Sequence, residues 1–511
     1  MNKKSLCMAF LAAPIILYFT LIMLNSVNIP IYDDIETILG FLARLNQAGS
    51  VGDVVTLFLR ADADHIIGMT RVMALGDRIL AGQVNFIHLI VGGNLFLLAL
   101  YMAISVAFRE RDVDRWMLFL PVSFLLFQIQ YWEISTWAVA ATTYFAVFFL
   151  ALLSLLFLQR ESTMGLVCAI ASAILACLTA ANGMFVFLAG MPLLLFRHRY
   201  VALSIWTMAA VVLIFVFFFF QGTGGNASGT NIAASIIRSL SDPTILLVNI
   251  LSSMGSTLGF GLKLPSVVAG SFIAACLVYV AYKKYYALNP VFFLFIVFLL
   301  MTCAAVALKR SLYGTDLILF TSRYRLISTI LTVCTYIALV ETMKTGEGAA
   351  NFARKALVFS IVFMVVSNIA YLPFLSGRCQ ELKSGENGIL HNNPTFAMEV
   401  LRSAKDSGLY RLPAGYLERG DARIARTPEG KLNRFASVFN NRTPRDTTLT
   451  IRLNLPWDNP WNGTLSCLLQ KPSVIYLFGS GSTPTTVRAG IHDVDPDQYH
   501  QNLVIRREDE R

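Results

Sequence analysis

The chain has 511 residues, of which 56% are hydrophobic, and its mean hydropathy is +0.62. That much apolar surface excludes an ordinary soluble globule and indicates a polytopic membrane protein, in which each span needs roughly 17–25 predominantly apolar residues. The formal net charge of +10 lies mostly in loops between apolar segments and gives no reason to expect nucleic acid as a partner.

Eleven apolar segments are candidate spans, so we predict an all-α polytopic membrane protein with about eleven transmembrane helices. The segments at 116–132, 164–180 and 184–196 are short, and the last two could instead form one re-entrant hairpin. The first segment has no small-x-small cleavage site after it, so we expect it to remain as an anchor. The eleven segments lie near 8–27, 85–108, 116–132, 138–158, 164–180, 184–196, 201–220, 265–282, 289–308, 325–342 and 356–376.

Basic residues between these segments predict the orientation of the chain. Positive charge in short loops is retained on the cytoplasmic side of a membrane. All six basic clusters fall on one face, which predicts a cytoplasmic N-terminus and exterior segments at 28–84, 221–263 and 377–511. The clusters are Lys3-Lys4, Arg109/Arg111/Arg115, Arg160, Arg197/Arg199, Lys283-Lys284 and Lys344/Arg354/Lys355.

An acidic pair, Asp33 and Asp34, stands in the sequence IPIYDDIETI directly after the first apolar segment. The predicted topology places both residues on the exterior. Two adjacent carboxylates at a membrane boundary repel each other and lose hydration, which favours a role as general base or metal ligand. The alternative is an ordinary solvated loop start. The sequence leaves the presence of a divalent cation at this pair open.

The rest of the first exterior segment carries apolar residues at helical spacing, as in IETILGFLARLNQAG and DVVTLFLRADADHIIGMTRVMALGDRIL. This pattern predicts amphipathic helices that lie in the membrane interface. Such helices would hold Asp64, His65 and Arg71 beside the membrane surface. The alternative is that these charges only solvate a loop.

Glu133 lies in the sequence QIQYWEISTWA, between the aromatic residues Tyr131, Trp132 and Trp137. Aromatic residues of this kind usually mark the membrane interface, but they could equally form a stacking platform for a sugar. Glu133 is therefore a second candidate acid or base on the exterior face.

Some basic residues lie on the face predicted to be exterior. The positive-inside rule does not favour them there, so they need an explanation. Arginine binds phosphate oxygens through two parallel hydrogen bonds, so cations at headgroup level suit a phosphate ligand. The alternative is that they only contact lipid headgroups. The candidates are Arg238, Lys309, Arg310, Arg323 and Arg325, with Tyr324 between the last two.

The composition changes after residue 376, so we predict a transmembrane domain over 1–376 and a second domain over 377–511. A helical piece near 395–408 is followed by turn-forming clusters and strand-like pieces such as TLTIRLNL and SVIYLF. This pattern predicts a small soluble α+β domain. In an oxidising exterior Cys379 and Cys467 could form a disulfide; the alternative is two unrelated thiols.

Taken together, these motifs resemble the GT-C superfamily of integral-membrane glycosyltransferases. The resemblance rests on YDD after the first span, then Asp64, His65, Arg71 and Asp77, then YWE and SRYR, within an architecture that covers the first 376 residues. The family pattern at this position is expected to read Glu-His-Arg. Here His65 departs from it, because Asp64 and Ile66 stand in the flanking places. The pattern is most similar to serotype-converting O-antigen glucosyltransferases and to related pilin and lipid A glycosyltransferases.

The resemblance implies transfer of a sugar from a polyprenyl-phosphate donor to an O-antigen-like glycan, a pilin or lipid A, outside the bacterial inner membrane. An aspartate of the acidic pair would be the general base of an inverting reaction, with Glu133 as a further catalytic candidate. The phosphate-binding candidates would be Arg71 and the exterior cations, while Asp64, His65 and Tyr324 would support the acceptor. A donor-synthesising glycosyltransferase and a flippase would act upstream.

The competing class is a transporter or lipid flippase. Such proteins often carry ionisable residues or broken helices near the middle of the membrane, in two related halves. Here the spans are almost free of charge and no two-fold repeat is visible. The sequence also lacks nucleotide-binding glycine motifs and zinc-ligand spacing, so no certain cofactor is expected.

Overall fold

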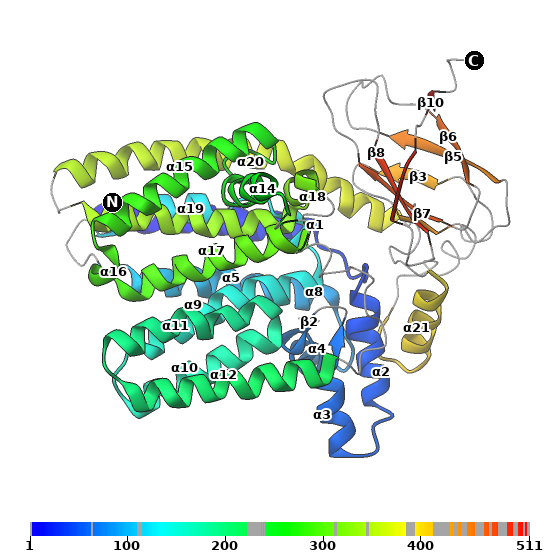
Figure 1. Ribbon diagram of the computed structural model, residues 1–511. Helices are drawn as coiled ribbons and strands as arrows, with labels where there is room; N and C mark the ends of the chain where they lie inside the picture. The colour runs from blue at the N-terminus through cyan, green and yellow to red at the C-terminus, as the bar shows by residue number, and fades with distance from the viewer. Residues whose placement is uncertain are drawn as a thin grey trace. The chain divides into compact units, whose positions relative to one another are not determined.

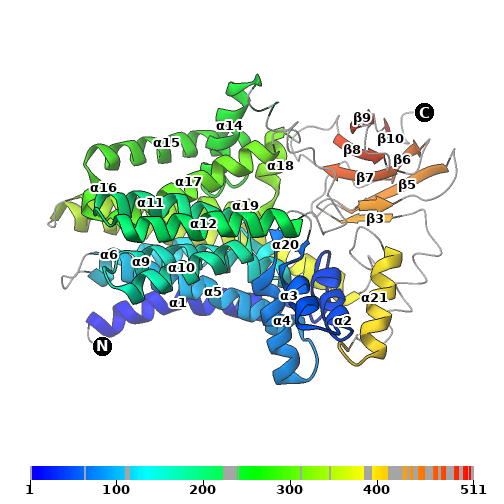
Figure 2. The same cartoon turned by 60° about the horizontal axis from the view of Figure 1, so that its bottom comes forward.

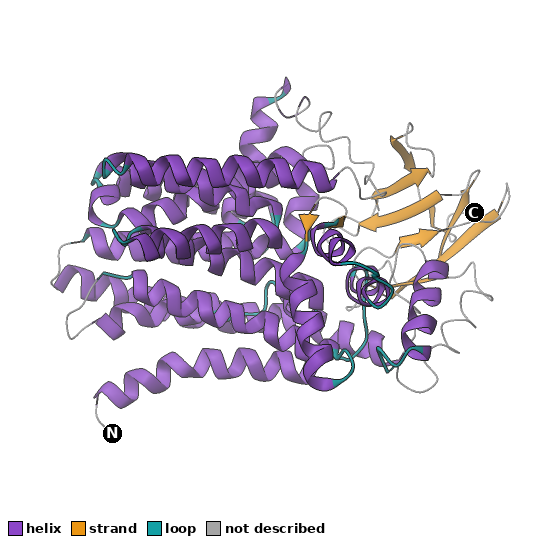
Figure 3. Cartoon of the chain, turned by 90° about the horizontal axis from the view of Figure 1, so that it is seen from below, coloured by secondary structure: helices purple, strands orange, loops and turns teal. Residues whose placement is uncertain are grey.

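A computed structural model describes most of the chain as helices, with few strands before residue 430. Figure 3 shows this predominance of helix. After residue 411 only eight strands are described, and only as backbone. The described residues are 3–62, 65–109, 115–221, 237, 239, 241–310, 314–343, 347–384, 394–411 and the strands between 430 and 507.

Among the described residues, eight helical segments are long and apolar enough to cross a membrane, which confirms the prediction of a multi-pass helical protein. They are α1 (Lys3–Asn25), α5 (Phe86–Ala107), the continuous segment Ala138–Leu158, α12 (Tyr200–Gln221), α15 (Lys263–Tyr282), α17 (Pro290–Arg310), α19 (Ser322–Thr342) and α20 (Glu347–Ser384). The segment Ala138–Leu158 consists of α8 (Ala138–Ala140), the π-helical turn η2 (Ala141–Phe145) and α9 (Ala146–Leu158).

Four further apolar helices are shorter than a full span. They are α6 (Arg115–Leu126), α10 (Thr163–Thr179), α11 (Phe185–Phe196) with the preceding 3-10 turn η3 (Ala181–Met184), and α14 (Pro243–Gly255). The first three correspond to the three segments that the sequence marks as short. All eleven predicted segments therefore contain a helix, while α14 was not predicted.

The chain divides into two compact units. The first, here the helical unit, contains residues 1–30 and 40–376. The second unit contains residues 31–39 and 377–511. The YDD sequence therefore belongs by its contacts to the second unit, although the chain reaches it directly from α1.

The two ends of the helical unit can be identified from Figures 1 and 2. The N-terminus and α16 (Tyr285–Leu288) lie at one end, which we call the N-terminal end, and α18 (Gly314–Phe320) lies at the other, which we call the distal end. Because the long helices alternate in direction, α1 and α17 finish at the distal end, where α5 and α19 begin.

A half-buried carboxylate joins four elements at the N-terminal end. Glu341, in the last turn of α19, accepts hydrogen bonds from the Tyr285 hydroxyl at 2.5 Å, from Asn289 Nδ2 at 2.9 Å and from the Arg109 backbone N–H at 2.6 Å. Burial and the neighbouring Glu341 raise the pKa of Tyr285 well above its ordinary value, so its hydroxyl stays a donor. These contacts hold α19 to the end of α5 and the start of α17.

Helix α14 runs across the bundle rather than along it, as Figures 1 and 2 show. The sequence predicts an exterior segment here without a span, whereas the structure has a helix whose second half is buried against α15, α17, α18 and α19. Two glycines allow the close approach to α15. A Cβ on Gly270 would collide with the Leu251 carbonyl oxygen, and a Cβ on Gly255 with the Ser266 carbonyl oxygen. Small residues of this kind let membrane helices pack backbone to backbone.

The first segment predicted to be exterior, residues 28–84, forms short helices, as predicted. In the helical unit they are α2 (Phe41–Leu45), α3 (Val51–Leu59) and α4 (Gly68–Ala81), with a two-stranded pairing of β1 (Ala61–Asp62) and β2 (His65–Ile66) before α4. Ser50 and Asp53 form a capping box that starts α3. Helices α2 and α3 run across the direction of the long helices (Figure 1), and α3 has no buried residue.

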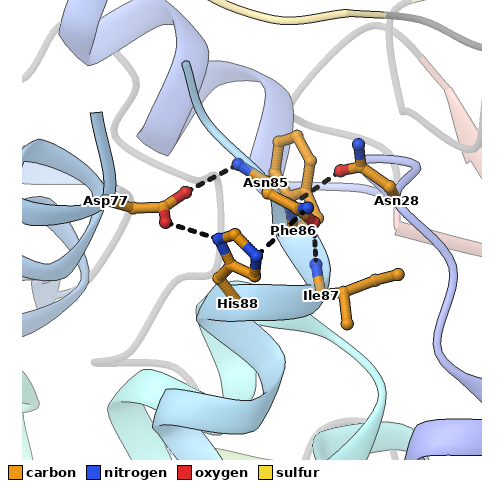
Figure 4. Close-up of polar contacts among 6 residues, drawn as sticks. All are labelled: Asn28, Asp77, Asn85, Phe86, Ile87 and His88. Carbon is orange, nitrogen blue, oxygen red and sulfur yellow. Dashed lines mark hydrogen bonds and ion pairs between the residues drawn. The ribbon is translucent and has the colours of Figure 1, made fainter. Parts of the chain in front are cut away.

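The junction between α4 and α5 is fixed by the polar contacts drawn in Figure 4. Asp77 accepts the Asn85 backbone N–H at 2.7 Å and contacts His88 Nδ1 at 2.8 Å. The Asn85 side chain caps α5 by accepting the Ile87 N–H, and the Asn28 side chain accepts the Phe86 N–H. Asp77 is therefore used to join two helices.

The second unit contains η1 (Ile35–Gly40) in part, the end of α20, α21 (Pro394–Asp406) and eight strands. The strands form two four-stranded sheets with the orders β10-β6-β5-β3 and β4-β7-β8-β9, antiparallel except for β3 with β5. They are β3 (Gly430–Asn433), β4 (Val438–Asn440), β5 (Thr447–Asn454), β6 (Thr464–Leu469), β7 (Ser473–Phe478), β8 (Arg488–Asp493), β9 (Tyr499–Leu503) and β10 (Arg506–Arg507).

Candidate functional site

Five polar residues gather at the distal end of the helical unit, and we call them the distal cluster: Glu133, Arg310, Ser322, Arg323 and Tyr324. Glu133 comes from α7 (Trp132–Ser135), Arg310 ends α17, and the other three begin α19. A cation in the last turn of a helix is favoured by the helix dipole, which helps to explain Arg310 there. The turn from α17 through α18 to α19 brings residues 310 and 324 together.

Two side-chain hydrogen bonds connect the distal cluster. Ser322 Oγ donates to Glu133 Oε2 at 3.0 Å, and Arg310 Nε donates to the Tyr324 hydroxyl oxygen at 3.0 Å. The Arg323 guanidinium lies over the rings of Trp137 at 6.0 Å and Tyr324 at 5.7 Å, and it interacts electrostatically with Glu133. The cluster thus combines two guanidinium groups with one carboxylate, among aromatic rings.

Tyr144 also belongs to the surroundings of the cluster, although the sequence gave no reason to select it. Its hydroxyl interacts electrostatically with Arg310, Arg323, Tyr324 and Glu133. Tyr144 lies on the π-helical turn η2, and such turns are frequent at functional sites. The only local signal is the polar sequence ATTYF inside an otherwise apolar span, and that signal does not identify a partner.

Arg325 lies outside this cluster and packs against Tyr371 of α20. Its side chain is buried, Nη2 donates to the Leu319 carbonyl at 3.0 Å, and the guanidinium stacks on Tyr371 at 4.7 Å. Gly261 has a φ of +75° and leaves room for this group, because a Cβ there would collide with the guanidinium. Within the described residues, Nε and Nη1 of Arg325 have no hydrogen-bond partner.

The two aspartates of the acidic pair differ in burial. Asp33 is exposed, and its backbone carbonyl accepts the Thr37 N–H. Asp34 is buried, and its Oδ2 accepts the Ile31 backbone N–H at 3.1 Å, which stabilises the turn. Asp33 is therefore the exposed member of the pair, whereas Asp34 is buried and stabilises the local turn.

Arg71 takes part in the fold of residues 28–84. It is buried on α4, and its Nη1 donates to the backbone carbonyls of Phe58 at 2.9 Å and Arg60 at 2.6 Å. Its guanidinium lies over the Phe41 ring at 5.6 Å. Arg71 thus connects α2, α3 and α4, a role that the sequence pattern did not predict.

The other predicted site residues are placed as follows. Lys309 is half-buried in the last turn of α17. Arg238 and Asp64 lie outside the described residues, and His65 is described only as backbone in β2. Cys379 is buried, and the Cys467 side chain lies outside the described residues, so the disulfide between them stays a prediction. In the described part of the chain no three His, Cys, Asp or Glu residues are arranged to hold a metal ion.

The chemistry available at the distal cluster is that of an anion site with one carboxylate. The Arg310 and Arg323 guanidinium groups can donate to phosphate-type oxygens, as can the hydroxyls of Tyr324 and the neighbouring Tyr144. Glu133 can accept a proton or hold Ser322. A comparison of the sequence with models of protein families and with curated proteins finds no match. Function must therefore be inferred from the residues themselves.

Proposed function

We propose that this protein is a membrane glycosyltransferase that moves a sugar from a polyprenyl-phosphate donor to a glycan acceptor. The observation that carries the proposal is the distal cluster, in which Arg310 and Arg323 gather beside Tyr324 and Glu133 at one end of a multi-pass bundle. This arrangement supports binding of an anion held at the membrane boundary. A lipid-linked phosphate is such an anion.

The arginines would act mainly on the leaving group. When the bond between the anomeric carbon and the phosphate oxygen breaks, the bonding electron pair stays on the lipid phosphate, whose negative charge grows. Arg310 and Arg323 would stabilise that charge, since fixed guanidinium groups in a water-poor site act strongly on developing charge. Tyr324 and Tyr144 would donate hydrogen bonds to the same oxygens.

The acceptor hydroxyl must lose a proton as it attacks the anomeric carbon, with inversion there. We assign this general-base role to Asp33, because its carboxylate is exposed while that of Asp34 is engaged in a turn. Glu133 is the other carboxylate proposed for the reaction, and its contact with Ser322 favours a positioning role. No step in this scheme consumes a nucleotide.

The finer assignments belong to the same proposal. The basic loops would lie in the cytoplasm of a bacterial cell, and residues 377–511 would form a soluble α+β domain in the periplasm. Helices α2 and α3 would lie in the membrane interface, where the exposed Val51 and Val55 would contact lipid. The acceptor would be an O-antigen-like glycan, with a pilin or lipid A as alternatives, and a separate enzyme and flippase would supply the donor.

The test is reconstitution of the reaction with the purified full-length protein. A synthetic polyprenyl-phosphate sugar and purified acceptor glycans should yield an acceptor heavier by one sugar, together with free polyprenyl phosphate. A nucleotide sugar offered in place of the lipid donor should yield none. Deletion of the gene should remove one sugar mass from lipopolysaccharide repeats, pilin or lipid A. Unchanged masses in all three would contradict the proposal.

A further inference from the structure

The second half of α14 presents an unusual polar face to the interior of the helical unit. Asn249, Ser252 and Ser253 are all fully buried. They stand at positions i, i+3 and i+4, so they share one side of the helix. Asn249 Oδ1 accepts a hydrogen bond from Thr315 Oγ1 at 2.7 Å. This face is therefore directed at α18 and at the interior of the bundle.

Several polar atoms on this face have no partner within the described residues. They are Asn249 Nδ2 and the hydroxyl oxygens of Ser252 and Ser253. Among the described residues, the Ser253 side chain interacts with the thiol of Cys303 on α17, which is a weak hydrogen-bonding group. An unpaired buried polar group destabilises the folded protein, and lipid offers no partner either.

Neighbouring serine and threonine side chains behave differently. Ser328 Oγ on α19 donates to the Met254 carbonyl at 2.6 Å, and Thr257 Oγ1 donates to the Arg325 carbonyl at 2.7 Å. Many other hydroxyls in the described helices donate to the carbonyl four residues earlier, as Thr329 does. Asn249, Ser252 and Ser253, together with Ser266 of α15, therefore differ from the other buried hydroxyl and amide side chains of this seam.

We infer that this face binds internal water. The unpaired atoms are an amide donor and two hydroxyls that both donate and accept, with no charged group among them. A neutral ligand that is small and can both donate and accept matches this set, and buried waters typically make about three such hydrogen bonds to otherwise unpaired groups. The water would link α14 to α17 and α18. This inference is independent of the proposed enzymatic function.

The direct test is radiolytic labelling of the intact protein in detergent. Hydroxyl radicals from a short X-ray pulse oxidise side chains that touch water, including trapped water, and mass spectrometry locates the products. Cys303 beside Ser253 should be oxidised several-fold faster than Cys334, although both thiols are fully buried. Equal labelling of the two cysteines would overturn the inference.

A second test measures the thermal midpoint of Ser252→Ala. If the hydroxyl binds water, its removal should lower the midpoint by roughly 2–4 °C through loss of a hydrogen bond. If the hydroxyl is truly unpaired, its removal ends a desolvation cost, so the midpoint should rise and the inference fails. Ser328→Ala calibrates the measurement, because that hydroxyl has a protein partner and its loss should lower the midpoint in either case.

Discussion

At the scale of single residues, Asp33 and Asp34 provide a matched pair. Asp33→Asn preserves shape and removes the proposed proton acceptor, so turnover should fall by roughly 10²–10⁴. Asp34→Asn should keep most of the turnover, because the amide oxygen can still accept the Ile31 N–H. Both variants would be assayed with the synthetic donor after checking membrane insertion. Equal activity of Asp33→Asn and wild type would move the search for the base to Glu133.

The arginines offer a second comparison of this kind. Arg323→Gln should reduce turnover with the lipid donor by roughly 10²–10³, because a preorganised charge at the leaving group is lost, while the protein stays folded. Arg71→Gln removes two hydrogen bonds to the backbone carbonyls of Phe58 and Arg60, so it should mainly lower the yield and thermal stability of the protein. Steady-state kinetics and thermal melts separate the two. A purely kinetic effect of Arg71→Gln would restore it as a phosphate ligand.

At the scale of elements, the contact between α14 and α15 depends on Gly270. Gly270→Leu forces a side chain against the Leu251 carbonyl, and overpacking of this kind costs about 1–3 kcal/mol or more. Gly76 on α4 is the control, since a Cβ there meets nothing within 4 Å. Gly76→Ala should leave stability unchanged or raise it by about 0.5–1 kcal/mol. Unfolding in a denaturing detergent would rank the variants, and equal stability of the two would contradict this account.

The sequence predicted the helices well where apolar runs were long and uninterrupted, because length and hydropathy alone identify a span. It missed α14, since Pro243, Asn249, Ser252 and Ser253 break the apolar run there. Only packing against α15 and α19 makes that segment an interior helix. Likewise the sequence SRYR predicts cations at the start of α19. It does not predict that Arg323 interacts electrostatically with Glu133 while Arg325 stacks on Tyr371, because that depends on the direction of each side chain in the fold.

At the scale of the whole molecule, the prediction concerns sidedness. Reporter fusions at Ala48, Leu240 and Asn440 should be exterior, whereas fusions at Asp112 and Tyr286 should be interior, because basic loops are retained in the cytoplasm. Alkaline phosphatase and a fluorescent protein, active on opposite sides, would read each position. An interior Asn440 fusion would contradict the proposed periplasmic domain and the assignment of Asp33 to the exterior.

The contacts of Glu341 can form only after most of the membrane helices have been synthesised. The Arg109 backbone N–H meets this carboxylate across 232 residues of sequence. At about 5–20 residues per second, the ribosome needs roughly 12–46 s to supply it after α5 has been made. During that interval the first helices must wait in the membrane without their final partner, and a chain released before residue 341 can never close the N-terminal end of the bundle.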